Sequence, residues 1–140
     1  MRLKDMVFSR DGRYLLMIGG IPDFRISIFD LEQNKKLNLT LDSSKLPCKD
    51  GDYRKAKFNP QNGREFAILS STCVYFYKIH QGYEVTDQED QKYLGESERL
   101  SFLEYRNQEN PELVFTTFIW DQYKRVHVCT DMPMLIQVDS

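Results

Sequence analysis

Short apolar segments separated by polar turns follow one another along the whole chain, and three times they occur in the same order. Each unit has an apolar strand, a polar turn, a second strand, and a third strand that ends in an apolar–acidic or aromatic pair. Phe8 and Phe58 stand at equivalent places in the first two units, and so do Phe29 and Phe76. Their spacing of roughly 40 to 50 residues is typical of propeller blades. The pattern predicts a repeat protein with units at about 3–41, 53–105 and 113–140.

The apolar runs inside these units are too short for helices and are bounded by turn residues, which favours β-strands. Central strands are expected at 14–18, 66–70 and 125–129, and third strands at 25–29, 74–79 and 134–138. Leu37–Leu41 alternates strictly between leucine and polar residues, so it is the expected outer strand of the first unit. Leu100–Tyr105 also alternates and is expected to be the outer strand of the second unit or part of an added hairpin.

Turn residues separate the first two strands of each of the first two units. Asp11-Gly12 and Asn62-Gly63 are expected to occupy equivalent tight turns, because Asn, Asp and Gly tolerate positive φ. Asn59-Pro60 is expected to start its turn, since proline fixes φ and has no N–H to donate. Asp42–Asp52 is the expected irregular connection between units, and Thr86–Gln91 the expected solvated loop.

One such unit cannot bury its own apolar face, so the units must stack around a common axis. Because propellers typically close with about four to eight blades, three units predict only part of a ring. The expected fold class is therefore all-β. We expect a partial β-propeller of about three antiparallel four-stranded sheets, belonging to a larger propeller.

Composition narrows the possible partners. Hydrophobic residues make up 41% of the chain and aromatic residues 13%, enough for a packed core. The net charge of −2 provides no basic field, so no nucleic-acid partner is expected. No stretch approaches the roughly 20 apolar residues of a membrane span, and no signal-type segment opens the chain, so we expect no membrane partner and an intracellular protein.

Three widely spaced cysteines, Cys48, Cys73 and Cys129, form a poor disulfide framework. Cys73 and Cys129 lie in apolar runs, where we expect buried thiols that pack as small hydrophobes. His127 and Cys129 are two residues apart and would share one face of a strand, which leaves open a minor possibility of metal binding. We predict no metal site.

No motif in the chain predicts catalysis or cofactor binding. Gly19-Gly20 follows a strand, but no helix-forming segment opens after it, so a turn or bulge is expected in place of a phosphate loop. Ser70–Thr72 lies at a turn without a nucleophile elbow. Phe29 is expected to pack between sheets, Asp30 to satisfy backbone donors at a turn, and Trp120 to lie in the core. We therefore predict no catalytic residues, no cofactor and no enzymatic activity.

Several segments resemble the WD40 repeat. Phe8–Leu15 is similar to the opening of such a repeat, with its Asp-Gly turn, and Ile28-Phe29-Asp30 is similar to its closing strand. Phe58–Asn62 resembles the start of the next blade, and Phe118–Asp139 resembles a further one. The resemblance implies a WD40-type β-propeller.

The variant turn at Gly19–Phe24 and the order of the blades resemble the large cilia- and flagella-associated WD-repeat proteins. Thr130–Pro133 lacks the glycine usual in that family. This resemblance implies a non-catalytic scaffold of the ciliary or flagellar axoneme, part of the cytoskeleton. Its partners would be WD-repeat, coiled-coil, dynein-arm or microtubule-associated proteins, and its role would be in ciliary motility.

Two other kinds of protein stay open on the sequence alone. One is a cytosolic adaptor, such as a ubiquitin ligase receptor or vesicle coat, and the other is the gating propeller of a hydrolase. For a scaffold, the two loops that depart most from the repeat, 42–52 and 86–91, are the expected contact sites, because binding residues concentrate on loops held by a rigid framework.

Overall fold

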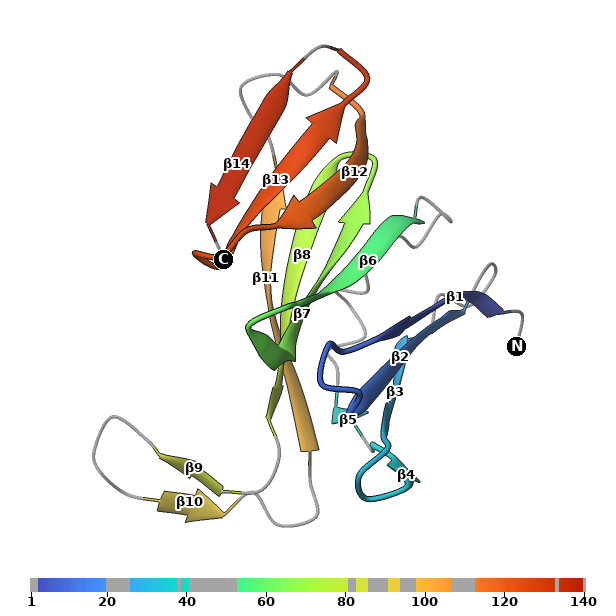
Figure 1. Cartoon of the computed structure of the whole chain (residues 1–140), viewed down its shortest axis with the longest axis vertical. Coiled ribbons are helices and arrows are strands. Elements are labelled where there is room, and N and C mark those ends of the chain that lie inside the picture. The colour runs from blue at the N-terminus through green and yellow to red at the C-terminus, as the bar shows by residue number, and fades with distance from the viewer. Residues whose placement is uncertain are drawn as a thin grey trace.

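The computed structural model describes residues 3–19, 26–37, 39–40, 53–80, 83–85, 91–93, 98–106, 113–132 and 134–139. Every regular element in these ranges is a β-strand, and the strands form three larger sheets and one small hairpin (Figure 1). The sheets follow one another in the order of the sequence. The chain passes from the first sheet near the N-terminus through the second to the third near the C-terminus (Figure 1).

The first sheet has the order β1-β2-β3-β4, and all neighbours are antiparallel. Its strands are β1 (Leu3–Phe8), β2 (Tyr14–Gly19), β3 (Ile26–Asp30) and β4 (Lys35–Lys36). The expected outer strand at Leu37–Leu41 was wrong. The outer strand is β4, and Leu39–Thr40 forms β5, which pairs with β11 at the edge of the second sheet. Leu37 is buried between the two sheets, so the chain crosses from one to the other at this point.

The second sheet has the order β5-β11-β8-β7-β6. Its long strands are β6 (Tyr53–Asn59), β7 (Asn62–Ser70), β8 (Cys73–His80) and β11 (Glu98–Arg106). The prediction that Leu100–Tyr105 follows β8 as the outer strand of this unit's own segment is confirmed, because β11 pairs antiparallel with β8, and β5 from the first unit pairs beyond it only at Glu98 and Arg99. A hairpin of β9 (Tyr83–Val85) and β10 (Gln91–Tyr93) lies between β8 and β11 in the sequence and accounts for the greater length of the unit.

The third sheet has the order β12-β13-β14, from β12 (Phe115–Trp120), β13 (Arg125–Thr130) and β14 (Leu135–Asp139). Its strands are antiparallel neighbours. The described residues thus give this sheet three strands, where the repeat pattern predicted four.

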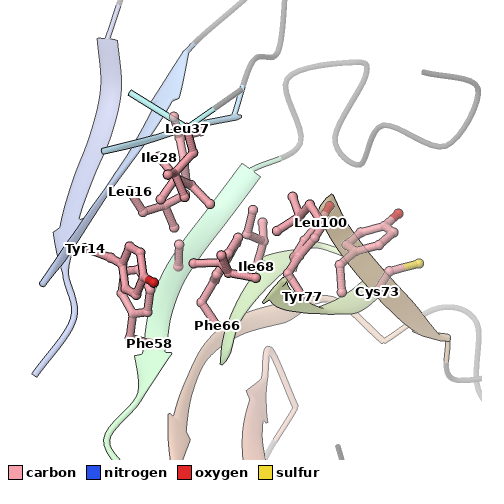
Figure 2. Packing of buried hydrophobic residues seen from close by; sticks show 14 residues of the cluster. Tyr14, Leu16, Ile28, Leu37, Phe58, Phe66, Ile68, Cys73, Tyr77 and Leu100 are labelled. Atoms are coloured by element: carbon pink, nitrogen blue, oxygen red, sulfur yellow. The ribbon is translucent and has the colours of Figure 1, made fainter. Parts of the chain in front are cut away.

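The second sheet is buried on both faces. Side chains alternate along its strands, and apolar side chains point both towards the first sheet and towards the third. Phe66 and Ile68 of β7 point towards the first sheet, and Ala67 and Leu69 point towards the third. Figure 2 shows the first of these interfaces, in which apolar side chains of both sheets meet. The second interface contains Ala67, Leu69, Val74, Phe76, Phe115, Phe118, Val126, Val128 and Val138.

One row of side chains runs across β6, β7 and β8 on the face that meets the first sheet. Phe58 lies opposite Phe66, and Phe66 lies opposite Tyr77. The ring centres are 5.4 Å apart in the first pair and 4.9 Å apart in the second, which is stacked. The equivalent row of the first sheet is Phe8, Leu15 and Phe29.

This comparison corrects the matching of the closing residues. Phe29 lies opposite Leu15, on the face turned away from the second sheet, and is half-buried. Phe76 lies opposite Ala67, on the face turned towards the third sheet, and is buried. Phe29 therefore corresponds to Tyr77 and not to Phe76, because a shift of one residue moves a side chain to the other face. Phe29 does not pack between two sheets of the described chain.

Hydrogen bonds also link neighbouring sheets. The Tyr53 hydroxyl of β6 donates to Asp5 of β1, and the Phe115 N–H donates to the Ser71 carbonyl at 2.7 Å. The ammonium of Lys55 donates to the Thr117 hydroxyl at 3.3 Å, and the indole N–H of Trp120 donates to the Lys57 carbonyl at 3.1 Å. Strand β6 is thus hydrogen-bonded to β1 of the first sheet and to β12 of the third sheet.

Candidate functional site

The loop between β1 and β2 is held by a compact set of hydrogen bonds. The buried Ser9 hydroxyl donates to Asp11 Oδ1 at 2.6 Å and accepts from the Tyr14 N–H at 3.0 Å. Asp11 Oδ1 also accepts from the Arg13 N–H at 3.1 Å. The hydrogen bonds from Ser9 and Arg13 lower the pKa of the Asp11 carboxyl. Gly12 has φ +74°, as expected for glycine in this turn.

The turn between β6 and β7 is shorter and differs from the sequence prediction. It is formed by Pro60 and Gln61, because Asn59 pairs with Asn62 across it. Asn59 Oδ1 accepts from the Gln61 N–H at 3.0 Å, so Asn59-Pro60 starts the turn as predicted. Gly63 already lies in β7 and does not have a positive φ. The predicted equivalence of Asn62-Gly63 with Asp11-Gly12 was wrong.

The two turns touch at Gly63. A Cβ added to Gly63 would lie 2.9 Å from Asp11 Oδ2, so only glycine permits this approach without displacing the carboxylate. Around this contact lies an open depression of about 340 Å³ lined by Arg10, Asp11, Pro60, Gln61 and Gly63. Arg10, Asp11 and Gln61 are exposed. The depression offers a cation, a carboxylate and an amide on a backbone fixed by local hydrogen bonds.

The loop between β12 and β13 is organised around Asp121. Its Oδ1 accepts from the backbone N–H groups of Tyr123 at 2.7 Å and Arg125 at 3.0 Å. Its Oδ2 lies 2.9 Å from Arg125 Nε and 2.8 Å from His127 Nε2. Desolvation acts to raise the pKa of Asp121, but the hydrogen bonds from His127, Arg125 and Tyr123 outweigh it and hold the pKa far below its usual range. The carboxylate therefore stays ionised and fixes the loop.

Asp30 has the role that the sequence predicted for it. It is fully buried, and its Oδ1 accepts from the N–H groups of Glu32 at 3.1 Å and Gln33 at 3.2 Å. Its Oδ2 lies 3.4 Å from Arg13 Nη2. Asp139, the acidic residue that ends the third unit as Asp30 ends the first, is exposed.

Of the two cysteines predicted to be buried, one is buried and the other is exposed. Cys73 is buried in the first interface, as predicted. Cys129 is exposed, so its prediction was wrong, because it lies on the face of β13 opposite to the buried Val126 and Val128. Cys48 lies outside the described residues.

The minor metal possibility at His127 and Cys129 gains no support from the geometry. His127 Nε2 is engaged by Asp121, and the part of the chain that the structure describes contains no group of three or more metal-ligating side chains.

Among the described residues, no helix is long and apolar enough to cross a membrane.

Nearly all of the two predicted contact loops lies outside the described residues. Positions 42–52 lie outside the described residues, as do 86–90, and Gln91 begins β10. The turn at Gly19-Gly20 is described only as far as Gly19, the last residue of β2. The Ser70–Thr72 turn is confirmed, with the Ser70 hydroxyl accepting from the Cys73 N–H at 2.9 Å.

Sequence reasoning missed the contact of Asp11 with Gly63 and the role of Asp121. The signal for Asp121 was present, since an aspartate directly after a strand often accepts a hydrogen bond from the backbone two residues further on and so caps its own loop. The Asp11–Gly63 contact has no local signal, because its residues come from different sheets.

Comparison with solved structures identifies the fold. The β-propeller domain of Cps50 (Swd1) from Myceliophteria thermophila matches with a TM-score of 0.60 and 14% identity, over 99% of this chain and 38% of that chain. The WD40 domain of SCAP from fission yeast matches with a TM-score of 0.43 and 10% identity, over 99% of this chain and 41% of that one. The chain thus spans less than half the length of either.

No known protein-family profile matches the sequence, and a search of curated proteins finds no match. The predicted fold class is nevertheless confirmed: the described chain is all-β and matches part of a β-propeller.

Proposed function

We propose that the chain is a non-catalytic protein-binding scaffold that works in the ciliary or flagellar axoneme. The observation that carries the scaffold role is the depression where the β1–β2 loop meets the β6–β7 turn. Its exposed side chains stand on turns held by Ser9, Asp11 and Asn59, so a partner would meet a surface that is already ordered. Preorganisation of this kind reduces the entropy lost on binding.

The charged groups at this end of the sheets are used to hold the backbone. Asp11, Asp30 and Asp121 each accept hydrogen bonds from backbone N–H groups of their own loops. A carboxylate that is ionised and fully engaged is a poor general acid. This use of the acidic residues favours a scaffold over an enzyme.

The axonemal setting rests on the resemblance of Gly19–Phe24 and of the blade order to the cilia- and flagella-associated WD-repeat proteins. Dynein-arm and other axonemal proteins are accordingly the proposed partners, and ciliary motility the proposed process.

The test compares two variants of the tagged full-length protein in ciliated cells. Arg10→Glu with Gln61→Glu changes the exposed lining of the depression. Lys36→Glu with Gln122→Glu makes the same charge change at exposed positions elsewhere. We expect the first variant to be depleted from isolated axonemes and the second to be incorporated like the wild type. Equal incorporation of both variants at equal expression would contradict the proposed binding surface.

A further inference from the structure

Two lysines lie side by side at the junction of the second and third sheets. Lys55 and Lys57 are two residues apart on β6, so their side chains leave the same face of the strand. Lys55 lies opposite Leu69 and Lys57 lies opposite Ala67. Because Leu69 and Ala67 pack towards the third sheet, both lysines point into the junction with β12.

The residues of β12 confirm this placement. The Lys55 ammonium donates to the Thr117 hydroxyl at 3.3 Å, and the Trp120 indole N–H donates to the carbonyl of Lys57 at 3.1 Å. Both lysines are half-buried. The junction therefore holds two cations, a hydroxyl and the edge of a half-buried tryptophan within a short length of β6 and β12.

No acidic side chain neutralises these cations in the described part of the chain. Strand β12 carries no charged residue. Glu65, on the neighbouring β7, is hydrogen-bonded to Asn59 Nδ2 at 3.0 Å. The other charged residue of β6, Arg54, is exposed and is itself basic. Two like charges in a half-buried position without a counter-charge are unfavourable.

The proton affinity of Lys57 reflects the same imbalance. Desolvation, together with the charge of the adjacent Lys55, lowers the pKa of the Lys57 ammonium. An anion bound between the two lysines would remove the repulsion. Thr117 can also donate its own hydroxyl proton to such an anion, because it accepts the hydrogen bond from Lys55.

Strand β6 is the edge of its sheet, and so is β12. At the junction each of these two strands has one side without a hydrogen-bonded neighbour in the described sheets (Figure 1). An extended segment of another protein can approach there with a carboxylate side chain directed at the lysines. We propose that Lys55, Lys57 and Thr117 form a docking site for an acidic segment of a partner protein.

This inference rests on the proposed function in that the occupant is a protein. Its test uses the full chain in solution and needs no cilia, so its failure is distinguishable from failure of the axonemal proposal. The probe is a capped, fluorescently labelled hexaglutamate peptide, with hexaglutamine as the neutral control. Anisotropy is measured at low and at raised ionic strength.

We expect hexaglutamate to bind and hexaglutamine not to bind, with an affinity that falls as salt is added. Lys55→Gln with Lys57→Gln should weaken binding on the order of 10-fold or more, because charge-assisted hydrogen bonds are lost. Lys78→Gln combined with Lys36→Gln is the matched control at exposed positions and should leave binding unchanged.

Two further measurements guard against a trivial result. Lys55→Arg with Lys57→Arg keeps both charges and should retain binding even if the glutamine variant unfolds. In the wild type, bound hexaglutamate should slow reductive methylation of Lys57. Equal affinity in the lysine-to-glutamine and control variants would overturn the proposal. So would competition by inorganic phosphate at a concentration equal to that of the peptide, which would indicate a small-anion site.

Discussion

The indole N–H of Trp120 lies 3.1 Å from the carbonyl oxygen of Lys57, so this side chain links the third sheet to strand β6 of the second sheet. The same indole meets Phe76 edge to face, with ring centres 5.8 Å apart. Trp120 is half-buried and packs against the core of the second interface, whereas the sequence analysis expected it to lie within the core.

Two substitutions of Trp120 separate the contribution of its hydrogen bond to Lys57 from that of its ring contact with Phe76. Trp120→Phe keeps much of the ring contact but leaves the Lys57 carbonyl without its donor, and should reduce the free energy of unfolding by about 1 to 3 kcal/mol. Trp120→Ala should cost more, about 3 to 5 kcal/mol. Denaturant unfolding followed by circular dichroism measures both. No loss of stability in Trp120→Phe would show that the hydrogen bond contributes nothing, and equal losses in the two variants would show that the ring contact contributes nothing.

Phe66 and Phe29 allow a direct comparison of a buried and a half-buried phenylalanine. Phe66 is fully buried between Phe58 and Tyr77, so Phe66→Ala should lower the free energy of unfolding by about 3 to 5 kcal/mol. Phe29 faces away from the second sheet, so Phe29→Ala in the 140-residue chain should cost only about 1 kcal/mol. A loss at Phe29 as large as at Phe66 would contradict the assignment of the two faces.

Asp121 predicts a dependence of stability on pH. Because the folded-state pKa of its carboxyl is lowered, its stabilisation is fully present above the unfolded pKa of about 3.9. It is lost progressively as pH falls from there towards the lower folded-state pKa. Asp121→Asn should therefore destabilise the protein at neutral pH, and the difference from wild type should shrink below about pH 4.

Urea unfolding of both proteins at a series of pH values checks this prediction. Gln122→Ala, at an exposed and non-titrating position of the same loop, is the control and should leave the pH dependence of stability unchanged. A difference between Asp121→Asn and wild type that stays constant down to pH 2 would argue against an ionised, hydrogen-bonded Asp121.

The contact between Asp11 and Gly63 predicts that substitutions at the two positions interact. Gly63→Ala should displace the Asp11 carboxylate and weaken its hydrogen bonds with Ser9 and Arg13. In the Asp11→Ala background the same Gly63→Ala change should be better tolerated, giving a coupling energy of about 0.5 to 3 kcal/mol in a double-mutant cycle.

Gly12→Ala serves as the contrast, because open space surrounds Gly12 and only its positive φ opposes a side chain. It should cost about 1 to 2 kcal/mol and should not couple to Gly63. If Gly63→Ala has the same effect with and without Asp11, the two turns do not touch in solution.

Short apolar runs bounded by turn residues were enough to predict the central strands. Tyr14–Ile18 and Phe66–Ser70 fall inside β2 and β7. The alternation at Leu37–Leu41 was misleading, because a pattern with period two shows that a segment is extended but not which sheet it joins. Crossing to the second sheet is decided by the burial of Leu37, which depends on tertiary packing.

The turns show a similar limit. Asn62-Gly63 is a strong hairpin signal, but Pro60 with the Asn59 side chain closes the reversal two residues earlier. Phe29 and Phe76 were matched by residue type, although their registers place them on opposite faces. The depression at Arg10 and Gln61 was beyond sequence reasoning because it exists only where turns of two different sheets meet.

The central claim is that this propeller segment belongs to an axonemal scaffold, and the most direct test is the location of the tagged full-length protein in ciliated cells. The axoneme is separated from membrane and soluble matrix by detergent extraction, and the protein is quantified in each fraction. We predict that most of the ciliary pool remains with the extracted axoneme. A protein that never enters cilia, or that is wholly released by detergent, would contradict the account.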